Sequence, residues 1–224
     1  MRLHEPAVTL TDLALGIEAL ACALLLPGPS SDPKGRSLRT WFRTFFAATG
    51  SASLAGAALH GLFDADDDPR RVALWRLALG SIAVSSLAGW RIGSTLALPP
   101  SRARQVSAAA SIAYSGYLVA ITRTNPPYAV AIATYLPALG FLGWAFSRGL
   151  GRPGEREAAM LGLGGLGLSV AAAGIQLGRV HLHPRWFDHN ALYHLVQAIA
   201  VAAFFASARS YLAQARATKR LRPR

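Results

Sequence analysis

Seven apolar blocks of about twenty residues dominate this sequence, and short connectors between the blocks hold most of its charge. A helix of about twenty residues spans the hydrocarbon core of a bilayer, because each residue advances the helix by about 1.5 Å. The blocks therefore predict an all-α, polytopic membrane protein with a seven-helix transmembrane bundle. The predicted spans are residues 7–27, 40–63, 72–95, 104–122, 128–147, 157–178 and 190–211.

Composition supports the bilayer as the solvent for this chain. Of its 224 residues, 52% are hydrophobic and only 15% are charged, which is too apolar for an ordinary soluble surface. We expect residues 1–213 to form one seven-span domain and residues 214–224 to form a basic tail. The first block has the alternative of a cleaved signal peptide, but Asp12 and Glu18 interrupt it, which favours a span.

The distribution of lysine and arginine predicts the orientation. The N-terminus and the connectors on its side carry six of the 23 basic residues, the opposite side carries sixteen, and Arg76 lies within a span. By the positive-inside rule the N-terminus is outside and the C-terminus is cytoplasmic. All five tryptophans fall near span ends, as in an aromatic belt.

The net charge of +12 does not indicate nucleic-acid binding, because the basic residues lie in connectors and in the tail rather than on one recognition face. We therefore expect membrane lipids, and no nucleic acid, as partners. The single cysteine, Cys22, excludes an internal disulfide and reads as a small packed side chain.

All six histidines fall on the predicted outer side. On the last span, Asn190, His194 and Gln197 follow the spacing i, i+4, i+7, so they form one polar stripe that should face the bundle interior. His189 immediately precedes this stripe.

Two further spans offer polar residues to the same region. On the second span, Ser53, His60 and Asp64 share one face, and Asp64 lies one turn from His60, where it would orient the imidazole or act as a general base. On the first span, Asp12 lies in the outer half and Glu18 lies near mid-membrane, where an ionisable group is costly. The partner of Glu18 would be Arg76 or a proton.

Histidines on two helices at the same depth are the minimum for a metal site. His60 and His194 are the first two expected ligands, and His189 or Asn190 would be the third. Neutral imidazole suits Zn²⁺, and a three-ligand site with an open position lowers the pKa of bound water to about 7. Ser53 and Asp64 would then have catalytic roles, and Glu18, Asp12, Asn190 and Gln197 would line a polar pocket.

The span count, His60 and the segment His189-Asn190-Ala191-Leu192-Tyr193-His194 resemble the seven-span superfamily of alkaline ceramidases, haemolysin-III-like proteins and the progestin and adiponectin receptors. That resemblance implies a zinc site built from a histidine and a preceding serine in span two, an aspartate near span three and a His-x-x-x-His pair in span seven. Here Gly56 occupies the serine position and Asn190 that of the first histidine of the pair. The chain also resembles uncharacterised bacterial integral membrane proteins with a His-Asn-x-Leu-Tyr-His segment, which implies a bacterial inner (plasma) membrane location.

Three functional hypotheses follow. The first is a ceramidase-like, zinc-dependent membrane hydrolase acting on a lipid amide or ester through an outward-facing site. The second is a non-catalytic receptor-like lipid binder or transporter, in which the same polar residues bind ligand or proton without metal. The third is a haem protein with His60 and His194 as axial ligands.

Overall fold

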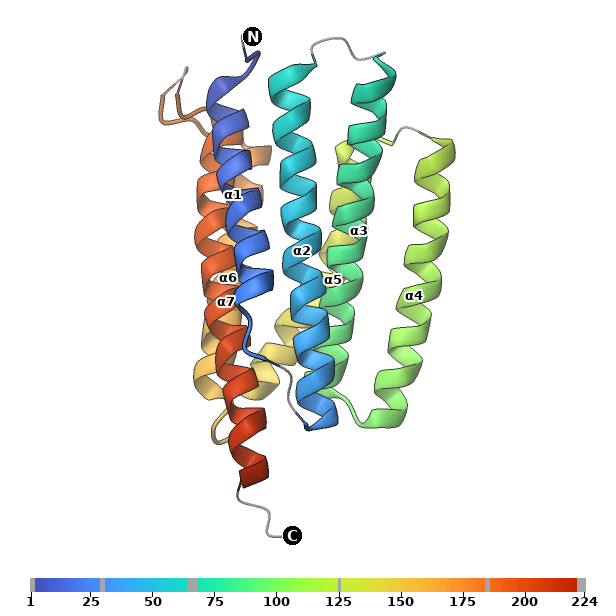
Figure 1. Ribbon diagram of the computed structural model, residues 1–224, viewed down its shortest axis with the longest axis vertical. Helices are drawn as coiled ribbons and strands as arrows, with labels where there is room; N and C mark the ends of the chain where they lie inside the picture. The colour runs from blue at the N-terminus through green and yellow to red at the C-terminus, as the bar shows by residue number, and fades with distance from the viewer. Residues whose placement is uncertain (1–2, 29–30, 64–67, 125, 184–185, 221–224) are drawn as a thin grey trace.

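The fold comes from a computed structural model that describes residues 3–28, 31–63, 68–124, 126–183 and 186–220. Its regular elements are seven helices, one for each apolar block, so the predicted all-α architecture is confirmed. Consecutive helices run in opposite directions, and the two termini lie at opposite ends of the molecule (Figure 1). The helices are α1 (Pro6–Leu25), α2 (Pro33–Leu62), α3 (Pro69–Ala97), α4 (Pro100–Arg123), α5 (Tyr128–Gly149), α6 (Arg156–Leu177) and α7 (His189–Arg220).

Five helices of the described chain are long and apolar enough to cross a membrane: α1, α3, α5, α6 and α7. Their most apolar stretches have a mean hydropathy of 1.5–1.8. Large side chains such as Leu24, Ile112 and Leu182 are 71–76% exposed, which is favourable in lipid and unfavourable in water. By length and composition the chain is therefore a helical membrane protein, and α2 and α4 lack a stretch as apolar as those in the other five helices.

Proline and aspartate determine several helix starts. Proline occupies one of the first helical positions of α1, α2, α3 and α4, where its missing N–H costs no hydrogen bond. The Asp32 carboxylate accepts from the Gly35 N–H at 2.8 Å and caps α2. Asp68 caps α3 in the same way, accepting from the Arg70 N–H at 2.8 Å.

Two helices extend beyond the predicted blocks. Helix α2 begins at Pro33 rather than residue 40, and α7 ends at Arg220 rather than residue 211. The added turns carry charged residues such as Lys34 and Arg216. Hydropathy predicts where the apolar part of a helix ends. In α2 and α7 the helical hydrogen bonds continue past that point.

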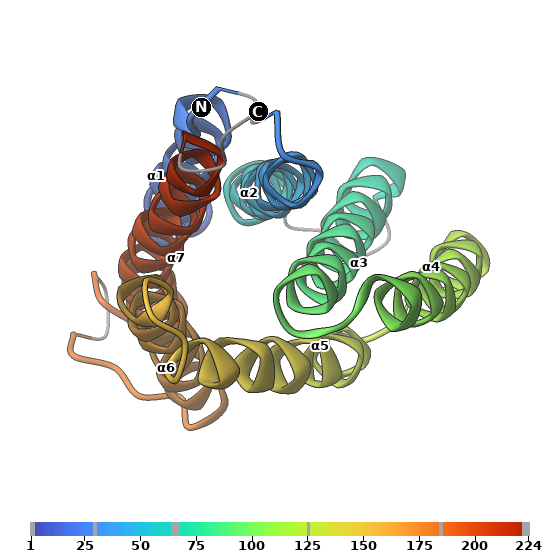
Figure 2. The same cartoon turned by 90° about the horizontal axis from the view of Figure 1, so that it is seen from below.

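The packing order of the helices determines which faces meet. Helix α2 packs against α1, α3 and α7, while α5 and α6 complete the bundle between α3 and α7 (Figure 2). The backbone of α4 approaches only that of α3 among the described helices. Helices α1 and α2 approach closely because Gly16 and Gly50 face each other across their contact. The main core contains the buried rings of Phe42, Phe45, Phe46, Phe146 and Phe204.

Candidate functional site

The site begins with His194, which projects from α7 and is only 8% exposed. Its Nδ1 lies 3.3 Å from Thr11 Oγ1, and its Nε2 lies 3.5 Å from Asp12 Oδ1, both on α1. The Thr11 hydroxyl donates its one proton to the carbonyl oxygens of Ala7 and Val8, at 2.9 and 3.1 Å. Nδ1 therefore faces the Thr11 hydroxyl and Nε2 faces the Asp12 carboxyl group, and the tautomer of the ring determines which atom of each contact donates.

Asp12 is more buried than its partner, at 4% exposure. Ser53 of α2 lies beside this carboxyl group, so α1, α2 and α7 all contribute to the cluster. We call Thr11, Asp12, Ser53 and His194 the buried polar cluster. A carboxyl group and an imidazole that face each other away from water can hold one proton between them, and removing either partner leaves an uncompensated polar group.

Gly56 creates the space for Asp12. A Cβ at this position would overlap Asp12 Oδ2 and would lie 3.2 Å from Cγ and 3.5 Å from Oδ1. The sequence shows this glycine only as a departure from a serine. The structure gives it a physical role, because the carboxyl group of a different helix occupies the volume that a side chain at position 56 would fill.

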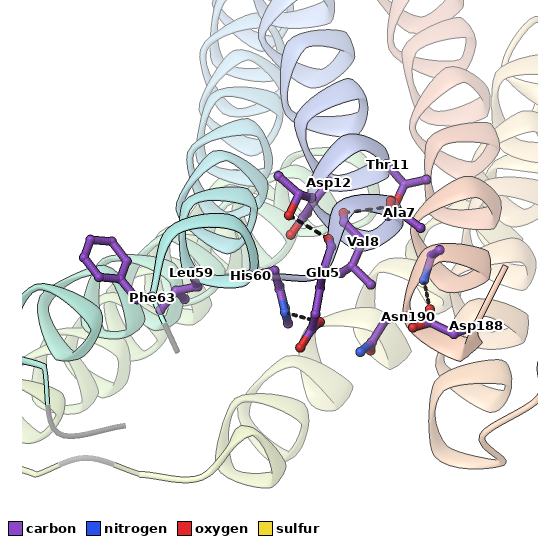
Figure 3. A network of polar contacts seen from close by, with 12 residues as sticks. Glu5, Ala7, Val8, Thr11, Asp12, Leu59, His60, Phe63, Asp188 and Asn190 are labelled. Carbon is purple, nitrogen blue, oxygen red and sulfur yellow. Dashed lines mark hydrogen bonds and ion pairs between the residues drawn. The ribbon is translucent and has the colours of Figure 1, made fainter. Parts of the chain in front are cut away.

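A second, more exposed layer lies at the outer end of the same helices. His60 Nδ1 lies 2.8 Å from Glu5 Oε2, with side-chain exposures of 34% and 52% (Figure 3). Glu5 precedes Asp12 by seven residues on the α1 side, and His60 follows Ser53 by seven residues on α2. Seven residues are two helical turns, so this layer lies about 10 Å above the buried polar cluster. We call Glu5 and His60 the outer pair.

The other predicted site residues have different surroundings. Asn190 accepts a hydrogen bond from the Gln176 side chain, and Gln197 donates to Ser169 Oγ at 3.4 Å, so both residues bind α6 rather than α1. His189 is half-buried at the start of α7. The predicted stripe on α7 therefore divides, with His194 turned towards α1 and its two neighbours turned towards α6.

Glu18 stands apart from the cluster. It is half-buried on α1 and forms no ion pair with Arg76 in the described chain, so that possible partner is ruled out. Asp64, which was expected beside His60, lies outside the described residues.

The zinc site expected from the sequence stays a prediction. Among residues 3–28, 31–63, 68–124, 126–183 and 186–220, no three His, Cys, Asp or Glu side chains form a group that could hold a metal ion. A catalytic zinc site uses three protein ligands. Within this part of the chain His60 faces Glu5 and His194 faces Asp12 and Thr11, so His60, His189 and His194 do not converge as a ligand set.

Residues 7–213 match the family described as "Family of unknown function (DUF6962)". The chain belongs to this family. The match runs from the first turn of α1 into α7 and so includes all four residues of the buried polar cluster. No curated protein and no solved structure matches the chain.

Sequence reasoning missed two contributors to the site. Glu5 lies before the first apolar block, so nothing in the hydropathy pattern connects it with His60. Gly56 has no side chain, so its type does not indicate that it leaves space for the Asp12 carboxyl group. Asp12 and His194 are 182 positions apart in the sequence, and only the packing of α7 on α1 brings them together.

Proposed function

We propose that the chain is a seven-span integral membrane protein with its N-terminus outside and its C-terminus in the cytoplasm. The support for a crossing α2 is its place between three apolar helices, α1, α3 and α7. Helix α4 runs alongside α3 for 24 residues, about 36 Å, which is longer than the hydrocarbon core. The excess of basic residues on the C-terminal side supports the orientation.

Phosphatase fusions test this topology. We expect a fusion after Leu98 to be inactive, because that connector is cytoplasmic, and a fusion after Thr124 to be active, because that connector is outside. Equal activity at both points would show that α4 does not cross. Reversed activities would overturn the orientation.

We further propose that the buried polar cluster binds a proton taken up from the outer side, in a non-catalytic transporter or receptor-like lipid binder. The observation that supports this function best is the separation of 3.5 Å between Asp12 Oδ1 and His194 Nε2, with side-chain exposures of only 5% and 10%. Ionisable groups inside a membrane protein are costly and commonly mark proton or ligand pathways. The Thr11 contact holds the imidazole so that Nε2, rather than Nδ1, faces the carboxyl group.

The outer pair supplies the entry point for that proton. Glu5 and His60 are partly exposed, and they lie two turns above Asp12 and Ser53 on the same two helices. A proton would pass from the outer pair to the Asp12–His194 pair, and the charge of the cluster would report the acidity outside.

Infrared difference spectroscopy of protein in nanodiscs tests the proton site. We expect a carboxylic acid C=O band that changes with the pH of the buffer, disappears in Asp12→Asn and shifts in His194→Gln. Glu18→Gln is the matched control, because Glu18 is an acid on the same helix outside the cluster, and it should leave the band unchanged. A spectrum in which Asp12→Asn removes no titrating band would refute the proposal.

Elemental analysis and absorption spectra of the same preparation separate the alternatives. Stoichiometric zinc that is lost in His194→Ala would favour the lipid amide or ester hydrolase and would overturn the metal-free proton site. A Soret band lost in the same variant would favour haem ligation instead.

A further inference from the structure

Helix α3 carries two half-buried arginines, Arg76 and Arg91, and the Nε of each is buried without a hydrogen-bond partner. They differ in the contacts that the rest of each guanidinium makes. Arg91 donates from Nη2 to Ser111 Oγ at 2.8 Å, and its guanidinium lies 4.8 Å from the centre of the Trp41 ring. Arg76 has a buried Nε without a partner, and within the described chain its guanidinium makes no hydrogen bond or ion pair. The positive charge of Arg76 therefore has no neutralising partner within the described chain.

The depth of Arg76 makes its lack of a partner costly. It lies seven residues after Pro69, the first residue of α3, which places its Cα about 10 Å along the helix. A charged side chain in a transmembrane segment normally pairs with another group or faces a polar cavity, because the hydrocarbon core offers no solvation. A ligand that brings an anion would supply the missing partner.

Arg76 lines a groove that can hold such a ligand. The groove has a volume of about 670 Å³, with α3 as its floor and α2 and α4 as its two walls. The two walls are separate, and the backbones of α2 and α4 do not contact each other within the described chain. Hydroxyl groups lie among apolar residues in the lining, which consists of Thr44, Ala47, Ala48, Ser51, Arg76, Leu77, Gly80, Ser81, Val84, Leu118, Ile121 and Thr122.

We propose that this groove binds one anionic membrane lipid, whose phosphate pairs with Arg76 and whose acyl chain lies along Leu77, Leu118 and Ile121. A guanidinium pairs strongly with phosphate through parallel N–H donors, which gives the charge complementarity. The apolar walls favour an attached acyl chain over a free anion. The proposal rests on the seven-span topology proposed above, which places Arg76 in the outer half of the bilayer.

Native mass spectrometry of the delipidated full chain tests the proposal with phosphatidylglycerol and phosphatidylcholine of identical acyl chains. We expect one preferred site for phosphatidylglycerol, with affinity reduced roughly ten- to a hundredfold in Arg76→Gln, since a hydrogen bond to a charged group contributes about 1.5–3 kcal/mol. Arg76→Lys keeps the charge and should retain the preference for phosphatidylglycerol. Arg104→Gln removes the same charge from the exposed surface of α4 and should bind like wild type.

Three results would overturn the proposal. They are equal binding of the two lipids, unchanged phosphatidylglycerol binding by a folded Arg76→Gln, and displacement of the lipid by inorganic phosphate, which would identify a free anion as the ligand. Far-UV circular dichroism and the melting temperature establish that each variant is folded. The phosphatase fusions separate failure of this proposal from failure of the topology, because they do not depend on Arg76.

Discussion

Replacing Gly56 with alanine should disrupt the buried polar cluster while adding only one methyl group. The new Cβ would overlap Asp12 Oδ2 and lie 3.2 Å from Cγ. Carbon and oxygen meet at about 3.3–3.6 Å even in favourable C–H···O contacts, so the carboxyl group must move. That movement separates Asp12 from His194 Nε2, which is already 3.5 Å from Oδ1.

The magnitude follows from opposing contributions. Alanine stabilises a helix interior by about 1 kcal/mol relative to glycine. Overpacking costs about 1–3 kcal/mol, and each weakened hydrogen bond of Asp12 costs about 1 kcal/mol more. We therefore expect Gly56→Ala to lower stability by about 1–3 kcal/mol, or roughly 2–4 °C in melting temperature per kcal/mol for a chain of this length.

The assay is thermal unfolding in detergent, arranged as a double-mutant cycle with Asp12→Ala. In the Asp12→Ala background, Gly56→Ala should become neutral or stabilising, because the obstructing carboxyl group is gone. Gly164→Ala is the matched control, since a Cβ at position 164 meets nothing within 4 Å and the glycine also lies within a helix. If Gly56→Ala is as stable as wild type in the presence of Asp12, the reasoning is refuted.

Two further predictions concern other polar contacts. Ser207 on α7 is fully buried and donates to the Ala158 carbonyl at 2.7 Å, so Ser207→Ala should cost about 1 kcal/mol in thermal unfolding, and no change would show that this bond adds nothing. Hydrogen bonds from the side chain and backbone of Arg70 lower the pKa of Asp68 from 3.8 to about 2, so its stabilising effect is complete above pH 3.8 and is lost as the pH falls towards 2. The difference in melting temperature between wild type and Asp68→Ala should therefore stay constant at neutral and mildly acidic pH and shrink towards pH 2, whereas a decline that begins near pH 6 would contradict this assignment.

Most of the secondary structure was predictable from the sequence. The seven blocks and the breakers between them predict seven helices, and each block corresponds to one helix of the structure. The helix boundaries were less predictable at α2 and α7, because both helices continue into water-facing turns where hydropathy carries no signal. The crossing of α2 and α4 is a proposal, since neither has a stretch as apolar as those in the other five helices.

The candidate site was only partly predictable. Asp12, Ser53 and His194 were all expected to contribute, because polar residues in apolar blocks stand out. Their mutual arrangement was not, because helical periodicity gives the face of one helix but not its neighbour. Asn190 and His194 share one stripe on α7, yet Asn190 binds Gln176 of α6 and His194 faces Asp12 of α1.

The sequence by itself determined the seven helices and the polar residues that the bilayer must accommodate, since both depend on local hydrophobicity and spacing. Only the tertiary structure decided which polar groups meet and which cation has no partner within the described chain. Asp12 meets His194 because α7 packs on α1 and Gly56 leaves room for the carboxyl group. Among the described residues Arg76 has no partner, because α2 and α4 stand apart on either side of α3. Such pairings depend on the arrangement of several helices at once, which no single segment of the chain specifies.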